Sequence, residues 1–308
     1  MILTFISIFC TGIIFSQSKY DIFKYGSVSD IKEIVSSEPL ILNSIDSLGR
    51  TPLWIAIDYN PNEDVAIELI KYGSDINTKD TIYKLAPIYR AILKNRFKVF
   101  NLILTNPKIN LNIQSKYGLT PIFYALSQRQ VGFANRLLDQ NVDVNIPTFS
   151  PINSTPIFAA ISSQLDTSLI KRLIDLGTDL THKTYNHNPL EYSLLIDSVN
   201  TNIISVLIST YKIKNIPFGN SYELLRNSIL KVDDAKILNS LLFNNKPFID
   251  SLNSKQIDRL LLLAYNQKDN VYFRTLISYG FKPDFRDWTF RNDKEKMEID
   301  ELIKNASR

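Results

Sequence analysis

The chain has 308 residues, of which 44% are hydrophobic and 21% are charged. This composition excludes a disordered or collagen-like protein, and the sequence has no apolar stretches that would suit a multi-span membrane protein. The 35 basic and 31 acidic residues leave a formal net charge of +4. A balance this even gives little support to nucleic-acid binding, which normally concentrates basic charge on one face. Length alone, at roughly 150 residues per domain, suggests about two domains.

The chain begins with an apolar segment, residues 1–16, and has no charged side chain before Lys19. Sixteen residues fall short of the ~20 that span a bilayer but suit the apolar region of a secretory signal. We therefore expect a signal peptide over residues 1–18 and export to the periplasm or the exterior; an N-terminal membrane anchor is the alternative. Cys10 lies in this segment, so the mature chain would contain no cysteine.

Two series of residues recur along the rest of the chain with spacings of 33 to 36 residues. The first series consists of prolines, each followed four positions later by a small residue: Pro52, Pro87, Pro121, Pro156 and Pro189, with Ala56, Ala91, Ala125, Ala160 and Ser193. The second consists of adjacent aliphatic pairs that begin at Ile34, Leu69, Leu102, Leu137, Leu173, Leu207, Leu241 and Leu276. Two series that stay in phase over most of the chain indicate an internal structural repeat.

Each repeat is predicted to form a helix, a turn, a second helix and an extended loop. A threonine caps the first helix, and proline at the first helical position loses no needed hydrogen bond. In the second helix the apolar residues fall at helical spacing, as at Val65, Leu69 and Ile70. The residues at the expected left-handed cap after this helix are glycine or asparagine: Gly73, Gly177, Gly280, Asn141 and Asn245.

These residues resemble the ankyrin repeat, whose signature is a Thr-Pro-Leu-His start, a Leu-Leu pair, a glycine and an Asp-Val-Asn run. The start appears here in residues 49–56, 118–125 and 154–160, and Gly-Ser-Asp-Ile-Asn at 73–77 closes the first of these units. The resemblance covers about residues 19–285 and weakens beyond Pro217. It implies an all-α, ankyrin-type helix-turn-helix solenoid with short β-hairpin loops and about eight units.

The family's histidine is absent from every copy of the start. Its positions hold Trp54, Tyr89, Phe123, Phe158 and Glu191. This departure leaves open how neighbouring repeats make the hydrogen bonds that the histidine makes in the family. We expect aromatic packing to substitute for them.

The repeat pattern predicts one elongated domain in place of the two suggested by length. The expected parts are an N-terminal capping repeat at 19–45, five ankyrin-like repeats at 46–215, two degenerate repeats at 216–285 and a C-terminal capping helix or tail at 286–308. The two degenerate repeats keep only the aliphatic pair of the second helix. In the tail, a helix over 293–306 would place Met297, Ile299, Leu302 and Ile303 on one face.

No group of residues supports catalysis. The two histidines, His182 and His187, share one loop and have no third metal ligand beside them. Phosphate-binding glycine loops, serine nucleophile elbows and Cys-His pairs are absent from the sequence. We therefore expect no enzyme activity, no cofactor and no metal. The alternatives are an activity housed in the degenerate C-terminal region, or a membrane-anchored structural protein.

The resemblance places the binding surface on the hairpin tips and the inner face of the first helices. The residues at these positions are Arg50, Tyr59, Tyr83, Lys84, Lys94, Lys116, Tyr117, Arg129, Tyr185 and His187. Tyrosine and arginine are common anchors of protein interfaces. The hypothesis is a basic-aromatic stripe that receives an acidic or extended protein partner, with the chain acting as a monomeric scaffold, inhibitor or stabiliser. No nucleic acid or small-molecule substrate is expected. The alternative is that the tyrosines only pack hairpin against hairpin.

Overall fold

A computed structural model describes residues 19–140, 142–232, 234–243, 245–267, 270–285, 288, 290 and 293–306. The expected signal peptide, with Cys10, and the cap residue Asn141 lie outside the described residues. The chain divides into two compact units, Met1–Phe149 and Ser150–Arg308, which we call unit 1 and unit 2 and describe separately.

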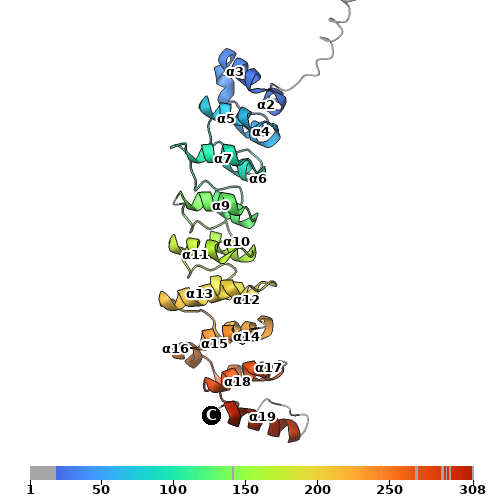
Figure 1. Ribbon diagram of the computed structural model, residues 1–308, viewed down its shortest axis with the longest axis vertical. Coiled ribbons are helices and arrows are strands. Elements are labelled where there is room, and N and C mark those ends of the chain that lie inside the picture. The colour runs from blue at the N-terminus through green and yellow to red at the C-terminus, as the bar shows by residue number, and fades with distance from the viewer. Residues whose placement is uncertain are drawn as a thin grey trace, which may run out of the picture. The chain divides into compact units, whose positions relative to one another are not determined.

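In unit 1 the described residues form a stack of helical pairs (Figure 1). The pairs are α2 (Asp21–Tyr25) with α3 (Val28–Ser37), α4 (Pro52–Tyr59) with α5 (Glu63–Lys71), α6 (Pro87–Leu93) with α7 (Phe97–Leu104), and α8 (Pro121–Ser127) with α9 (Val131–Leu138). A 3₁₀-helix, η1 (Pro39–Asn43), follows α3. First helices pack on first helices, as α6 does on α4 and α8, and the second helices α5 and α7 pack on one another. This is the arrangement that the repeat predicts.

The first helices begin as the sequence predicts. The hydroxyl of Thr51 accepts the N–H of Trp54 at 3.2 Å, and a proline follows at the first helical position. The small residues one turn later are buried, with Ala56 only 2% exposed and Ala91 fully buried. A larger side chain there would separate neighbouring first helices, so these alanines set the spacing of the stack.

Left-handed caps follow the second helices where glycine occupies the cap position. The φ angles are 89° at Gly73 and 87° at Gly177 and Gly280, which confirms these three caps. The prediction of a left-handed cap at Asn245 is wrong, because the φ angle of Asn245 is −122°. Asn245 instead precedes a short extra helix, and its carbonyl accepts the N–H groups of Phe248 and Ile249.

Unit 2 also consists of paired helices, with one short helix between two of the pairs. They are α10 (Pro156–Ser162) with α11 (Thr167–Asp175), α12 (Pro189–Leu195) with α13 (Thr201–Ile213), α14 (Ser221–Lys231) with α15 (Ala235–Leu242), the short α16 (Lys246–Asp250), α17 (Ser254–Tyr265) with α18 (Val271–Ser278), and α19 (Asp293–Ala306). The second helices continue through the degenerate region, where α13 packs on α15 and α15 on α18.

The degenerate repeats of unit 2 have complete first helices, which the sequence analysis did not recognise. Both helices start with asparagine in place of Thr-Pro. Asn220 accepts the N–H of Glu223, and Asn253 forms a reciprocal capping box with Gln256. The signal was present in the sequence as Asn followed three residues later by Glu or Gln.

Two finer expectations differ from the structure. The predicted tail helix is α19, but Met297 is 64% exposed while Ile299 is buried, so its apolar face is narrower than expected. The predicted short β-hairpins are mostly turns, because the β-pairing in the described residues is one isolated antiparallel bridge between Thr184 and His187. No described helix is both long enough and apolar enough to cross a membrane.

Candidate functional site

The turns that precede the first helices of unit 1 are folded around buried or half-buried polar side chains. One carboxylate oxygen of Asp46 accepts the N–H groups of Leu48 and Arg50, each at 2.9 Å. One carboxylate oxygen of Asp80 likewise accepts the N–H of Tyr83 at 2.7 Å. Each acidic side chain therefore fixes its turn from the inside and leaves the tip residues pointing outward.

Neighbouring turns are joined by backbone hydrogen bonds. The N–H of Lys116 donates to the carbonyl of Tyr83 at 2.8 Å, and the N–H of Phe149 donates to that of Tyr117 at 3.1 Å. An equivalent bond of 2.9 Å runs from the N–H of Thr81 to the Leu48 carbonyl. We call the joined segments, residues 48–50, 81–84, 116–118 and 149, the tip ladder.

The large side chains of the tip ladder are exposed. Tyr83 is 53% exposed, Tyr117 58% and Phe149 52%, and the aliphatic side chains of Leu48 and Ile82 are exposed beside them. Backbone groups make the ladder bonds, so these bonds do not depend on the rings. Unit 1 therefore presents a stripe of apolar side chains on a hydrogen-bonded support.

Two of the basic residues predicted for the stripe are held in ion pairs inside unit 1. A guanidinium nitrogen of Arg50 lies 2.6 Å from Asp46 and another donates to the hydroxyl of Tyr59 at 3.1 Å. The ammonium of Lys94 lies 3.4 Å from Asp58. Arg50 and Lys94 therefore meet acidic partners of their own chain.

The ion pair of Arg50 changes the acidity of its partner. Burial raises the pKa of Asp46, but the hydrogen bonds from the Arg50 side chain and from the Arg50 and Leu48 amides lower it more. The net pKa of Asp46 is therefore below its ordinary value. At neutral pH this carboxylate is ionised and holds both the turn and Arg50.

The other predicted basic residues of unit 1 are exposed. Lys84, Lys116 and Arg129 have no described carboxylate within ion-pair distance. Lys84 and Arg129 have φ angles of 55° and 56°, which places both at sharp turns. The Lys116 ammonium lies 6.0 Å from the ring centroid of Tyr117. The tip ladder thus contains two unpaired cations, Lys84 and Lys116, beside its exposed rings.

The first helices add a second group of contacts, which the sequence analysis missed. The Arg90 guanidinium stacks over the Trp54 ring at 4.3 Å and also pairs with Asp58. One repeat period separates Trp54 and Arg90 from one another along the chain, and α4 packs on α6. A search for side chains at equivalent positions of neighbouring repeats would have found this pair.

The residues in place of the family's histidine make hydrogen bonds between repeats as well as aromatic contacts. The hydroxyl of Tyr89 lies 2.5 Å from the Ile113 carbonyl and 2.6 Å from that of Leu119, both in the following repeat. In unit 2, the Glu191 carboxylate accepts the N–H of Asn220 at 2.6 Å. Aromatic packing alone was therefore an incomplete expectation, although Phe158 does pack edge-on against Tyr192 at 5.2 Å.

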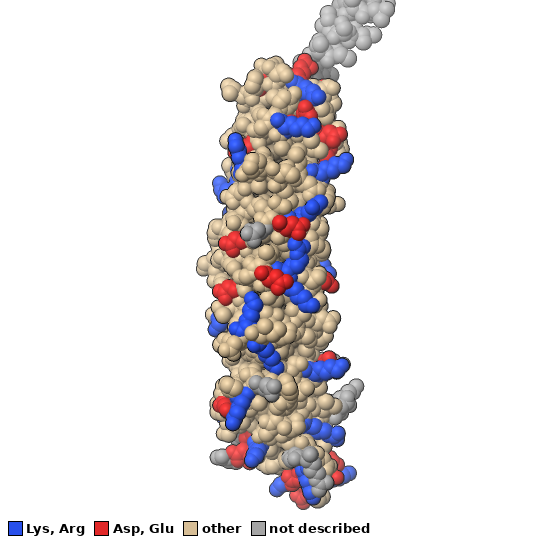
Figure 2. Space-filling view, turned by 60° about the vertical axis from the view of Figure 1, so that its left-hand side comes forward, with Lys and Arg blue, Asp and Glu red and all other residues tan. Residues whose placement is uncertain are grey.

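The remaining predicted site residues, Tyr185 and His187, belong to unit 2. Tyr185 is 60% exposed, and the backbone of His187 pairs with that of Thr184. The His182 ring nitrogen lies 2.7 Å from the Asn153 carbonyl. In the described part of the chain, no group of three or more His, Cys, Asp or Glu residues is placed to hold a metal ion. On the face shown in Figure 2, basic and acidic side chains are interspersed.

Comparison with known proteins places this repeat architecture in a family. The sequence model of the ankyrin repeat matches residues 48–81, which contain Asp80 and the pair α4 and α5. An ankyrin repeat protein of Acanthamoeba polyphaga mimivirus is 25% identical over 241 residues, which cover 78% of this chain and 29% of that protein. Alpha-latrotoxin-Lt1a of Latrodectus tredecimguttatus is 33% identical over 85 residues, or 28% of this chain and 6% of the toxin.

A solved ankyrin repeat protein gives a TM-score of 0.51 at 24% identity and covers 59% of this chain and 91% of its own; this likeness concerns the fold. The chain spans less than a third of the length of the curated relatives named above. The helical pairs, the turns and the family match together define an α-helical repeat protein. The chain contains an ankyrin repeat at residues 48–81, and its helical pairs have the ankyrin-type fold. Ankyrin repeats are in general modules of protein–protein interaction.

Proposed function

We propose that the chain is a non-enzymatic binding module that holds a protein partner on the tip ladder of unit 1. The observation that carries this proposal is the exposure of Tyr83, Tyr117 and Phe149, each more than half exposed on backbone that is already hydrogen-bonded. Contiguous exposed apolar side chains on a soluble protein are a common mark of an interaction surface. The turn of Tyr83 is fixed by Asp80 and that of Tyr117 by Ser115, so little conformational entropy is lost when a partner orders them.

The charges of the tip ladder favour a partner with acidic residues. Lys84 and Lys116 are exposed and unpaired among the described carboxylates, whereas Arg50 is already paired with Asp46. The partner surface would therefore combine apolar side chains with carboxylates spaced to meet two lysines. Charges of this kind at the rim mainly raise the rate of association and select among partners.

A second function in the degenerate region receives no support from the packing. The second helices continue without interruption from α13 to α15 and α18. Lys212 is the one exposed titratable side chain among the residues that line the groove beside α13 and α16, so this groove offers no acid–base pair.

The experiment compares two double variants of the full chain. Tyr83→Ala with Tyr117→Ala removes two exposed rings of the tip ladder. Tyr25→Ala with Tyr72→Ala removes two exposed tyrosines of unit 1 that lie elsewhere. Proteins captured by the natural chain from its own source are identified, and the affinity for the captured partner is then measured with each purified variant.

We expect the tip variant to weaken partner binding at least about tenfold, because interface tyrosines are frequent hot spots, and the control variant to bind normally. Both should melt within a few degrees of the natural chain. Equal affinity for the two variants, or a large loss of stability in the tip variant alone, would show that the rings serve the fold instead.

A further inference from the structure

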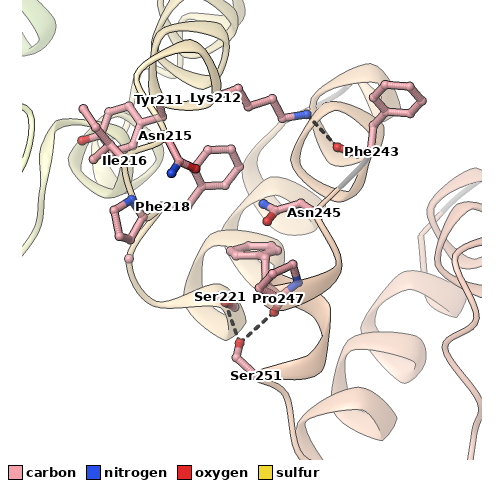
Figure 3. Close-up of a pocket in the computed structure, with 13 residues that line it drawn as sticks. Tyr211, Lys212, Asn215, Ile216, Phe218, Ser221, Phe243, Asn245, Pro247 and Ser251 are labelled. Carbon is pink, nitrogen blue, oxygen red and sulfur yellow. Dashed lines mark hydrogen bonds between the residues drawn. The ribbon is translucent and has the colours of Figure 1, made fainter.

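Unit 2 contains a groove of about 680 Å³ where the repeat pattern breaks down (Figure 3). One side is the connector from α13 to α14, residues 214–220, and the other consists of Phe243 and residues 245–251, which include α16. Neither side is a hairpin tip. Pockets that hold peptides or small molecules have volumes of roughly 300–1,000 Å³, so the groove is large enough for several residues of a bound chain.

The floor of the groove is apolar and its rim contains two prolines. Phe218 and Phe248 are each 6% exposed and pack edge-to-face with their ring centroids 5.6 Å apart. Pro217 and Pro247 also line the groove and are exposed. At one end, the hydroxyls of Ser251 and Ser221 are hydrogen-bonded at 2.8 Å. An apolar side chain of a ligand would find a preformed apolar surface here.

A single cation lies at the opposite end. The side chain of Lys212 extends from α13 across the groove, and its ammonium donates to the carbonyls of Ser240 and Phe243 at 2.6 and 2.9 Å (Figure 3). An ammonium has three protons, so one donor remains. The residues that line the groove include no aspartate or glutamate. Burial lowers the pKa of Lys212, and the described residues offer it no carboxylate to offset this effect.

Two asparagine amides face the space between these ends. Asn215 is exposed, and its side chain bonds to no described group. Asn245 donates to the Leu241 carbonyl at 3.3 Å, which leaves its own carbonyl oxygen unused by described residues. Figure 3 shows Asn215 and Asn245 on opposite sides of the groove below Lys212. Each amide carries a donor and an acceptor, which match the two polar groups of a peptide bond.

We propose that this groove binds an extended peptide segment of a partner protein in which an apolar side chain lies next to an aspartate or glutamate. The carboxylate meets Lys212, the apolar side chain lies on Phe218 and Phe248, and the amides of Asn215 and Asn245 hold the peptide backbone. The charge count selects this ligand over a phosphate or a nucleic acid. One ammonium balances one carboxylate, whereas phosphate groups are usually held by several cations or by a bidentate arginine.

The site is independent of the tip ladder, and the test keeps the two apart. The immobilised full chain selects binders from a phage-displayed library of random dodecapeptides, and one enriched peptide is synthesised with a fluorescent label. Its affinity is measured by fluorescence anisotropy against the natural chain and its variants. We expect enriched peptides to share an acidic residue beside an apolar one, and the Asp→Asn or Glu→Gln form of the labelled peptide to bind at least about tenfold more weakly.

Two pairs of variants locate the binding. Lys212→Gln should weaken it about tenfold, while Lys214→Gln, with the same charge change two residues away, should change it less than about twofold. Asn215→Asp places a carboxylate in the groove and should also weaken binding. Its control is Asn186→Asp, because Asn186 is likewise exposed with a positive φ of 66°. Aspartate tolerates such angles, so Asn215→Asp keeps the test valid if Lys212→Gln fails to fold.

Three outcomes would overturn the proposal. The library yields no acidic-apolar binders, the selected peptide binds Lys212→Gln and Asn215→Asp as it binds the natural chain, or the Tyr83→Ala, Tyr117→Ala variant abolishes its binding. The last result would place the peptide on the tip ladder. Normal peptide binding by that double variant, together with loss in Lys212→Gln, supports the groove even if no partner for the tip ladder is found.

Discussion

Unit 1 and the second half of unit 2 contain the same kind of helical pair but present different surfaces. In unit 1 the connectors are turns whose backbones bond to one another, as at Tyr83 and Lys116. In unit 2 the connector 214–220 and the helix α16 replace such turns, and a groove lies between them. The buried faces are maintained in both units. The comparison shows that the connectors, and not the helices, decide which surface an ankyrin repeat offers.

The difference begins with the residues that start the first helices. In unit 1, Thr51 and Thr120 cap helices whose first residue is proline, and the turn before each cap folds around Asp46 or Ser115. In unit 2, Asn220 caps α14 without a proline. There the Glu191 carboxylate accepts the Asn220 N–H, so a side chain of the preceding repeat holds the connector in place of a neighbouring tip. The connector before α14 is therefore held by a side chain and not by backbone bonds between tips.

The largest change in stability is expected from Gly118→Ala in the tip ladder, which tests whether contacts between tips support unit 1. Gly118 has a φ of 79°, and a Cβ atom there would lie 2.4 Å from the backbone nitrogen of Phe149. Left-handed backbone costs alanine about 1 kcal/mol, and the neighbouring tip must also move. We expect the free energy of unfolding to fall by about 3 kcal/mol, measured by urea denaturation.

The matched control is Gly73→Ala, which has a similar φ of 89° but open space around the new Cβ. It should cost about 1 kcal/mol. Equal losses at Gly118 and Gly73 would mean that the contact between tips contributes little, and the two units would then differ less than the structure indicates.

An intermediate loss of stability is expected when a buried tyrosine hydroxyl is removed. One such hydroxyl lies in each unit, so the two units can be compared directly. Tyr89→Phe removes the hydroxyl near the Ile113 and Leu119 carbonyls in unit 1, and Tyr211→Phe removes the one that donates to the Leu180 carbonyl at 2.6 Å in unit 2. Burial raises the pKa of both hydroxyls, so both are protonated donors at neutral pH.

Each substitution leaves a buried carbonyl without this donor and should lower the free energy of unfolding by about 2 kcal/mol. Tyr25→Phe is the control, since Tyr25 is 76% exposed and should change the stability little. A loss at Tyr89 alone would show that hydroxyl bonds between neighbouring segments matter in unit 1 and are dispensable in unit 2.

The helices of unit 1 could be predicted from sequence because their signals are local. A threonine cap, a proline and a small residue one turn later lie within six positions, as in residues 51–56, and the first helix α4 starts where they predict. The tail helix α19 was likewise predicted from one apolar face. The degenerate first helices were missed because their caps are asparagines, which also suit turns.

The candidate site was less predictable because it depends on contacts between repeats. Tyr83 and Tyr117 are exposed on tips that bond to neighbouring tips through the backbone, and a sequence does not show which side of a hairpin a ring will take. Lys94 was predicted to be a partner-binding residue, and its ammonium also lies 3.4 Å from Asp58 of the preceding repeat. Its pairing depends on side-chain directions across two packed helices, which spacing alone does not determine.

The smallest expected effect is a local loss of stability in the turn of Asp46 at low pH. Its pKa is lower in the folded chain than in the unfolded chain, where an aspartate has a pKa of about 3.9. The carboxylate therefore adds stability above that pH, and this contribution is lost as the pH falls through the lower folded value. We expect the protection of the Leu48 and Arg50 amides against hydrogen exchange, relative to intrinsic rates, to fall over this range. In unit 2 the backbone N–H of Asn215 donates to the Lys212 carbonyl, and its protection should show no matching change. Asp46→Asn should remove the pH dependence of protection at Leu48 and Arg50. If the dependence persists in this variant, another group causes it. The contrast between the carboxylate-held turns of unit 1 and the connectors of unit 2 would then be weaker.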